Sequence, residues 1–206
     1  MKRVMKPSYS EECIERDINE INEYRIDNAV FKNAELKRDY IQKEFFECEF
    51  HHISIHTNMR NSEFVDVIFD HCDFSNGNFE ECVFHRCEFK ACRMTGIDFS
   101  LSTFTDVSLN GCQCMLSNMN ATKWKQVEWL DTNFTDASFY SVRLKDVDVH
   151  TCLFNHCEIH ETPLVGINLS DSDIDGIAVL AENLKGVKVN SEQAIVLAQL
   201  LGIEVV

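Results

Sequence analysis

Residues 64–89 read FVDVIFDHCDFSNGNFEECVFHRCEF, and a phenylalanine returns at every fifth position. The same step continues to Ile174, and Cys114 is the one residue on it that is not large and apolar. Two places before each large residue the side chain is usually small or β-branched, as at Cys72. A period of five fits neither the 3.6 of a helix nor the 2 of a strand. It indicates a repeat architecture, in which each unit buries its apolar face by stacking on its neighbours.

Two inward side chains in every five residues suit a chain that turns a corner at each pentad. Four such sides close a roughly square turn of about twenty residues, and successive turns can stack at about 4.8 Å through backbone hydrogen bonds. Residues twenty apart, such as Phe64, Phe84, Phe104 and Trp124, should then form one column. Most of the glycines follow a large residue by two places, where a turn tolerates a positive φ. The sequence therefore predicts an all-β fold, a right-handed quadrilateral β-helix.

Several five-residue units also carry a family resemblance. The units CDFSN (72–76), SNMNA (117–121) and INLSD (167–171) resemble the pentapeptide-repeat family, whose consensus is small, Asp or Asn, Leu or Phe, polar, and often Gly. The ending, 184–203, is similar to the C-termini of the Qnr-type and mycobacterial fluoroquinolone-resistance branch. That resemblance implies a dimer joined at this end and a non-enzymatic DNA mimic that binds DNA gyrase or topoisomerase IV and lessens quinolone poisoning.

The repeat divides the chain into three segments. Residues 26–190 are expected to form the β-helix, whereas residues 1–25 do not follow the repeat. Apolar residues between Glu11 and Tyr24 have the spacing of a short amphipathic helix, which would cap the open first turn. A mobile arm is the alternative for this segment. Residues 191–206 form the third segment.

The early repeats are out of phase with the later ones. One shift lies between Leu36 and Phe50, where Phe45 and Phe46 compete for the inward position. A second shift lies between Ile55 and Met59. Such shifts require a bulge or a short loop, which often carries function, or they reflect imperfect early coils.

The third segment reads as a helical cap. Asn190 suits the N-cap, Gln193 the N3 position, and Gly202 the residue just past the helix. A monomer cannot bury all of the apolar residues of this segment against one coil end. We therefore expect the helix and tail to form a two-fold dimer interface. The predicted dimerisation residues are Ile195, Leu197, Leu200, Leu201, Ile203 and Val205.

Cysteine and histidine are abundant, yet their placement argues against a metal or catalytic site. Nine of the ten cysteines fall on inward positions, where Cys acts as a small buried hydrophobe. All eight histidines follow a large residue by one or two places and should point outward. Cys48 and the nearby His51, His52 and His56 should therefore diverge rather than converge on a metal. No nucleophile–base pair or phosphate-binding glycine loop is present, so we expect no enzyme activity and no cofactor.

Charge gives the strongest functional signal. The net charge is −15, which argues against direct nucleic-acid binding, and no apolar run approaches a membrane span, so the expected location is cytoplasmic. When the outward residues are assigned to four sides, three sides are acidic and the side of Phe64 is nearly balanced. The acidic residues predicted to contact a partner are Asp70, Asp73, Glu80, Glu81, Glu88, Asp98, Glu128, Asp131, Asp148, Glu158, Glu161 and Asp171.

A stiff acidic rod could imitate duplex DNA, which carries a phosphate charge about every 1.7 Å of its axis. The leading hypothesis is thus a DNA mimic for a type II topoisomerase. No insertion interrupts the repeat between 59 and 189, so protection through projecting loops is not carried over. The alternative is a scaffold for another protein partner, with Met115 and Leu116, near Leu130 and Leu153, as apolar contacts.

Overall fold

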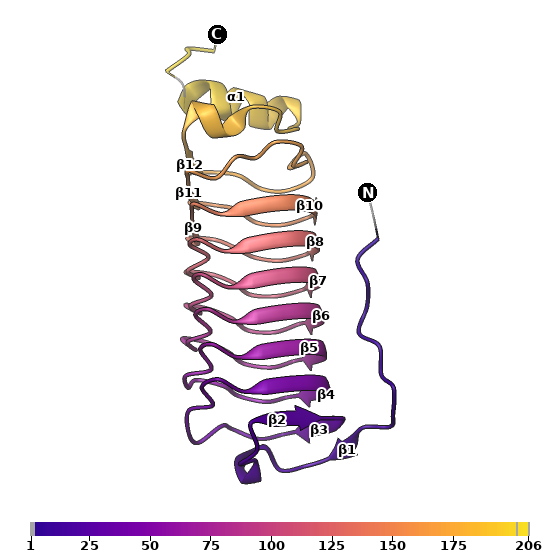
Figure 1. The fold of residues 1–206 in the computed structure, drawn as a ribbon. Coiled ribbons are helices and arrows are strands. Elements are labelled where there is room, and N and C mark those ends of the chain that lie inside the picture. The colour runs from indigo at the N-terminus through magenta and orange to yellow at the C-terminus, as the bar shows by residue number, and fades with distance from the viewer. Residues whose placement is uncertain (1–2, 201, 206) are drawn as a thin grey trace.

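The computed structural model describes residues 3–200 and 202–205, and it is a parallel β-solenoid closed at its C-terminal end by a helix (Figure 1). The strands of the main sheet stack in the order β1-β3-β4-β5-β6-β7-β8-β10, with β2 also paired to β4, and a second sheet has the order β12-β11-β9. The strands are β1 Ile14–Glu15, β2 Arg25–Asp27, β3 Ala29–Lys32, β4 Glu44–His51, β5 Glu63–Asp70, β6 Val83–Lys90, β7 Thr103–Asn110, β8 Lys123–Leu130, β9 Ser138–Tyr140, β10 Arg143–His150, β11 Glu158–His160 and β12 Ala178–Val179. The helices are the 3-10 turns η1 Ile18–Glu20 and η2 Ala181–Leu184, and the α-helix α1 Ser191–Leu200.

The five-residue period places its large side chains on a common axis, as predicted. Phe64 pairs with Phe84, Phe84 with Phe104, and Phe104 with Trp124, a step of 20 residues per turn. Their rings are stacked within 5° of parallel, with centroids 4.9, 4.8 and 3.7 Å apart along the column. Burying one phenylalanine side chain contributes about 1.5–3 kcal/mol, so these columns are a principal source of stability.

The small inward residues form a second, polar-tipped layer. The Cys87 thiol donates to the Phe64 carbonyl oxygen at 3.3 Å, and Cys92 donates to Phe69 at 3.5 Å. Thr162 makes the same contact with Phe139 at 2.9 Å. Because Cys, Ser and Thr all carry a small donor, each can fill this position and bond the turn beneath it.

Each eight-residue strand bends at its fourth residue, where φ is positive. These fourth residues, called here the corner file, lie one above another at the edge between two sides of the solenoid. The corner file consists of Glu47 (φ 51°), Asp66 (56°), Arg86 (50°), Asp106 (55°), Gln126 (56°) and Asp146 (55°). The predicted turn glycines likewise have positive φ, for example 69° at Gly96.

Both phase shifts are single-residue deletions on the same side of the solenoid. The inward residues step by four from Leu36 to Tyr40 and from Ile55 to 59, and the first turns therefore hold 19 residues, with Phe45 paired to Phe64. Phe45 is the inward residue, and Phe46 packs outside under the Arg25 guanidinium, 3.9 Å from the ring centroid. Of the two expectations for these shifts, the imperfect early coils match the structure and the bulge or short loop does not, because the side is shortened by one residue.

Gly77 marks the change from 19-residue to 20-residue turns. It lies on the first full-length side above the shortened one, and a Cβ there would lie 2.9 Å from the Ile55 carbonyl oxygen. A side chain at this position would push the two turns apart, so we infer that the change of length requires glycine.

The N-terminal segment does not form the helix expected between Glu11 and Tyr24. It contains β1, which pairs with β3, and the 3-10 turn η1. Ile18 and Ile21 are buried against the first turn, whereas Ile14 is exposed. The extended form is favoured because the Ile14 N–H can donate to Asn28 O of the open coil edge at 2.8 Å, which a helix could not do.

Candidate protein-binding surface

The four sides of the solenoid are named here by the inward residues Phe64, Phe69, Phe74 and Phe79, each followed upward in steps of 20. The structure brings the predicted acidic residues onto these sides, but their surroundings differ. Some carboxylates are engaged by neighbouring side chains, one is covered, and others are open. These differences decide which side can meet a partner.

The Phe79 side is the most open acidic surface. It carries Glu80, Glu81, Asp98, Glu158 and Glu161, and no Lys or Arg lies among its outward residues between 78 and 161, where His160 is the one titratable base. Glu81, Glu158 and Glu161 are exposed, and Glu80 and Asp98 are half-buried.

Two features give the Phe79 side a mixed character. The Glu161 carboxylate accepts hydrogen bonds from Ser141 Oγ at 2.7 Å and Tyr140 Oη at 2.6 Å, and these bonds lower its pKa. The side chains of Tyr140 and Leu101 lie on the same side, and each residue is about half exposed. Tyrosine is enriched at protein–protein interfaces.

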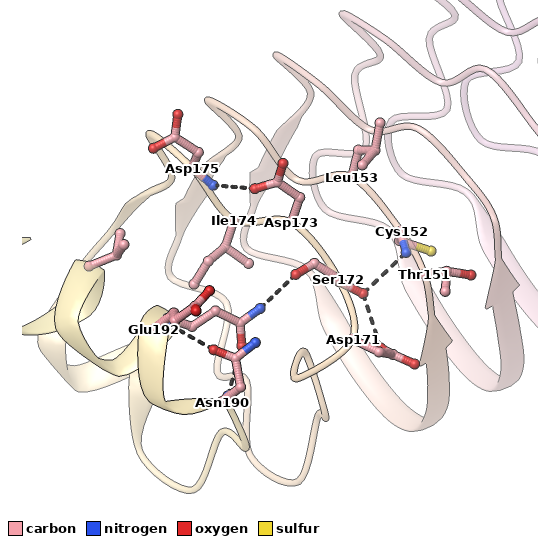
Figure 2. A pocket seen from close by; sticks show the side chains of 12 residues that line it. Thr151, Cys152, Leu153, Asp171, Ser172, Asp173, Ile174, Asp175, Asn190 and Glu192 are labelled. Carbon is pink, nitrogen blue, oxygen red and sulfur yellow. Dashed lines mark hydrogen bonds between the residues drawn. The ribbon is translucent and has the colours of Figure 1, made fainter.

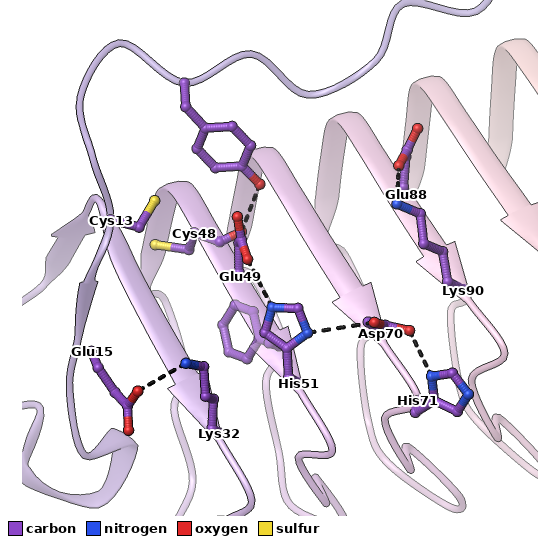
Figure 3. A network of polar contacts seen from close by, with 12 residues as sticks. Cys13, Glu15, Lys32, Cys48, Glu49, His51, Asp70, His71, Glu88 and Lys90 are labelled. Atoms are coloured by element: carbon purple, nitrogen blue, oxygen red, sulfur yellow. Dashed lines mark hydrogen bonds and ion pairs between the residues drawn. The ribbon is translucent and has the colours of Figure 1, made fainter.

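The Phe69 side holds a network of ionic contacts, shown in Figure 3. Asp70 lies between His51 and His71, with its oxygens 3.5 Å and 2.6 Å from their Nδ1 atoms. Partial burial raises the pKa of Asp70, but the hydrogen bond from His71 and the two imidazoles outweigh it, and the pKa is lowered overall. Higher on this side, His150 bridges Asp148 and Asp171, each at 3.4 Å.

Glu88 is the predicted contact residue that the structure removes from the surface. It is 7% exposed and is paired with Lys90 at 2.6 Å and with Lys6 of the N-terminal segment at 3.6 Å. Glu128 and Asp131, also predicted, remain half-buried and exposed respectively on this side. Glu88, predicted to contact a partner, is therefore covered in this structure by the start of the chain.

The Phe74 side is apolar at its centre. Leu116 is 61% exposed, Met115 is half-buried beside it, and Leu153 lies on the same side two turns higher. Leu130 belongs to the neighbouring Phe69 side. The predicted acidic residue of the Phe74 side, Asp73, is held by Ser75 and by Arg93, whose Nη1 lies 3.3 Å from it.

The C-terminal helix is fixed to the last turn by its own cap. Gln193 N donates to Asn190 Oδ1 and Asn190 N donates to Gln193 Oε1, both at 2.9 Å, which confirms the predicted capping box. The Gln193 amide also donates to the carbonyl oxygens of Leu169 and Ser172 at 2.7 and 2.6 Å. Gly202 has φ 76° and donates to Gln199 O, as expected of a residue just past a helix.

Of the predicted dimerisation residues, Leu197 is buried in the monomer against the last turn. Four others are exposed, and Leu201 lies outside the described residues. The exposed four are Ile195, Leu200, Ile203 and Val205. A groove of about 440 Å³ separates α1 from the turns below it and is lined by Asp171, Asp173, Asp175 and Glu192 (Figure 2).

The histidines and cysteines take the orientations expected from the repeat. Cys48 is buried, whereas His52 and His56 are exposed and His51 is half-buried. Within residues 3–200 and 202–205, no group of three His, Cys, Asp or Glu side chains is arranged to hold a metal ion. An internal void of about 20 Å³ beside Trp129 is of the size of a single water. No helix in the described part of the chain is long and apolar enough to cross a membrane.

Sequence reasoning missed the role of the N-terminal residues. Residues 3–13, called here the arm, run up the outside of the solenoid along the corner file (Figure 1). A signal was present, because Arg3 and Lys6 are basic in a strongly acidic chain, but nothing in the repeat says where they lie.

Comparison with known proteins agrees with this architecture. The profile of the pentapeptide repeat region matches residues 62–113 and 82–149. No curated protein sequence matches the chain. A trypsin-treated variant of QnrB1, a plasmid-mediated fluoroquinolone resistance protein, is 21% identical over 93% of this chain and 94% of its own, with a TM-score of 0.40.

Two further solved structures are similar at lower identity. Full-length QnrB1 is 17% identical, over 85% of this chain and 100% of its own, with a TM-score of 0.40. HetL, a pentapeptide repeat protein involved in heterocyst differentiation regulation in the cyanobacterium Nostoc, is 10% identical, over 80% and 86%, with a TM-score of 0.32.

Proposed function

The chain is a pentapeptide-repeat protein, and from this premise we propose that it is a non-enzymatic, dimeric DNA mimic that binds a type II topoisomerase. The partner, DNA gyrase or topoisomerase IV, is the one implied by the resemblance of the sequence 184–203. The observation that carries the proposal is the Phe79 side, where Glu80, Glu81 and Asp98 on two lower turns and Glu158 and Glu161 on a higher one lie with no Lys or Arg among the outward residues between 78 and 161.

The physical basis is shape combined with charge. Turns of a β-solenoid repeat at about 4.8 Å, so the carboxylates of one side lie in line on a rigid frame, at multiples of that spacing. A basic saddle built for duplex DNA would attract such a row, and the attraction would steer the encounter. Because the protein itself is acidic, it competes for the saddle and does not bind nucleic acid directly.

We propose that two copies join through α1 and the tail. The exposed apolar residues Ile195, Leu200 and Ile203 are close in sequence at the end of the solenoid and continue beyond the buried Leu197. An isologous contact would cover them and double the length of the acidic rod. We place the protein in the cytoplasm, where reducing conditions keep the internal thiols reduced.

The direct test is DNA supercoiling by purified gyrase in the presence of ciprofloxacin, with and without the protein. Rescue of supercoiling, or inhibition without the drug, is expected at micromolar dimer. The doubly substituted Glu81→Lys/Glu158→Lys protein should lose the effect. Asp136→Lys/Asp175→Lys, which changes charge equally on the Phe74 side, should keep it. No effect of the unsubstituted protein would remove the proposal, and an effect that survives raised salt would exclude charge mimicry.

A scaffold for another protein is the second candidate, favoured by the exposed Leu116 with Met115 and Leu153 on the Phe74 side. Contiguous exposed apolar surface is a feature of protein-interaction sites, and Met115 and Leu116 are adjacent on this side. Leu116→Asp would weaken a scaffold contact and leave the gyrase assay unchanged, which separates the two functions.

A further inference from the structure

The arm is held along the corner file by its backbone. Met5 N donates to Asp106 Oδ1 at 3.1 Å, Ser8 N donates to Asp66 Oδ1 at 3.0 Å, and Ser10 donates to Glu47 Oε2 through N and Oγ. These partners lie 101, 58 and 37 residues away in sequence. The contacts therefore exist only because the solenoid stacks its turns.

The spacing of these contacts matches an extended chain. Asp66 and Asp106 are two turns apart, about 9.6 Å at the usual strand separation. Ser8 is three positions after Met5, and an extended chain covers about 10 Å in three steps. The arm thus climbs the corner in register with the carboxylates, which explains how one segment reaches several turns.

The charges of the arm complement the surface that it covers. Lys6 is paired with Glu88, and Arg3 and Lys6 line a groove of about 500 Å³ opposite Glu88, Glu128 and Asp148. The last three are residues that the charge pattern assigns to partner binding. The two basic residues at the start of the arm, Arg3 and Lys6, therefore occupy part of the surface offered to a basic partner.

The arm lies on the outside of the solenoid, where Tyr9 is half-buried and donates from its hydroxyl to the Cys48 carbonyl oxygen at 3.4 Å. Among residues 3–13 none is buried, and the arm joins the solenoid at Ile14, where β1 pairs with β3. Its contacts with the corner file are hydrogen bonds, and an ion pair joins Lys6 to Glu88 on the Phe69 side. Water can replace each of these contacts. The arm can therefore lift without unfolding the turns beneath it.

We infer that the arm is an intramolecular cover of the Phe69 side, which must be displaced before an extended basic segment of a partner can bind there. The inference rests on the proposed function only in taking the acidic sides as contact surfaces. Because the arm is tethered, its effective concentration at the corner file is on the order of millimolar, and a free peptide competes poorly with it.

The test uses the full chain and a fluorescently labelled peptide of residues 1–12 added in trans. In the variant Arg3→Glu/Lys6→Glu the tethered arm is repelled, so the peptide should bind about tenfold or more tighter than to the unsubstituted chain. Lys37→Glu/Lys185→Glu changes the net charge equally at exposed lysines away from the arm, and it should bind the peptide as weakly as the unsubstituted chain. A further Asp106→Asn substitution in the arm-repelled variant should weaken peptide binding again.

Two results would overturn the inference. One is equal peptide affinity for the unsubstituted chain, Arg3→Glu/Lys6→Glu and Lys37→Glu/Lys185→Glu. The other is equal binding of a scrambled peptide of the same composition, because it would show that charge attracts the peptide without a defined binding site. Hydrogen exchange supplies the second readout: the amides of Met5 and Ser8 should exchange more slowly in the unsubstituted chain than in Arg3→Glu/Lys6→Glu. No topoisomerase enters these measurements, so their failure is separate from failure of the proposed function.

Discussion

The Trp124 indole lies flat on the Phe104 ring, with centroids 3.7 Å apart and 3° between the planes. The two residues are twenty positions apart, so the contact joins successive turns of the solenoid. It continues the stack of Phe64 and Phe84 below it. The column therefore links successive turns through their side chains, beside the hydrogen bonds that link their backbones.

Phe104→Ala should lower the free energy of unfolding by about 3–5 kcal/mol, because it opens a cavity between rings that cannot collapse. Thr105→Ala, a half-buried neighbour on the outer face, should cost less than about 0.5 kcal/mol. Urea denaturation followed by tryptophan fluorescence and circular dichroism measures both. Equal losses for the two variants would contradict a stacked core.

Gln193→Ala should release α1 from the solenoid. The substitution removes half of the capping box and leaves the carbonyl oxygens of Leu169 and Ser172 without their donor, at a cost of about 1–3 kcal/mol. Hydrogen exchange should speed up across Ser191–Leu200 and stay unchanged in β5 to β8. Gln199→Ala, exposed on the same helix, serves as the control, and an equal effect there would exclude the anchoring role.

The inward thiols should be inert in the folded protein. Burial raises the pKa of Cys48, Cys82, Cys87 and Cys157 to about 12 and that of Cys152 to about 11. Near pH 8.5 an ordinary cysteine is about half ionised, whereas these thiols stay almost wholly protonated. Iodoacetamide and mass spectrometry should detect labelling of Cys13 alone in the native chain and of all ten cysteines in guanidinium chloride. Fast native labelling at Cys87 would contradict an inward orientation.

His150 should stabilise the upper turns at low pH. Partial burial lowers its pKa, but Asp171 and Asp148 outweigh burial and raise the pKa above 6.5. A raised folded-state pKa gives stability that is fully present below pH 6.5 and is lost as the pH rises through the folded value. Because the imidazole is 44% exposed, water screens the contact, and the effect should be at most about 0.5 kcal/mol.

The measurement compares unfolding free energies of the unsubstituted protein and His150→Gln at about pH 5.5 and pH 8.5, on either side of the ordinary histidine pKa. The difference should be present at the lower pH only. In an Asp148→Asn/Asp171→Asn background the same substitution should have no pH dependence. A difference that grows with pH would reverse the assigned sign.

Ile195→Glu/Leu200→Glu should convert the proposed dimer to a monomer, because two carboxylates would be buried without partners in the interface. Light scattering after gel filtration measures the mass. Val83→Glu/Leu101→Glu, which alters exposed apolar residues on the solenoid wall, should leave the dimer intact. A monomeric mass for the unsubstituted chain would contradict the proposed dimer.

Repetition explains how much of the structure could be predicted from the sequence alone. A large apolar residue at every fifth position can be buried by a coil that turns a corner at each pentad, so the stacked columns and the outward histidines could be predicted from the repeat. The capping box between Asn190 and Gln193 could be predicted from the local sequence. Each of these depends on residues close in sequence or related by a constant step. Their positions could therefore be counted along the chain.

Only the tertiary structure decided the features that depend on contacts between unrelated positions. Three features arise where one turn meets another: the 19-residue turns, the need for Gly77 above the shortened side, and the binding of the arm to Asp66 and Asp106. Glu88 is buried because the arm, bound in this position, covers it. The five-residue period specifies which side chains face the axis. It does not specify where a non-repeating segment binds, because that position depends on charged side chains and carbonyl groups that only the stacking of turns brings together.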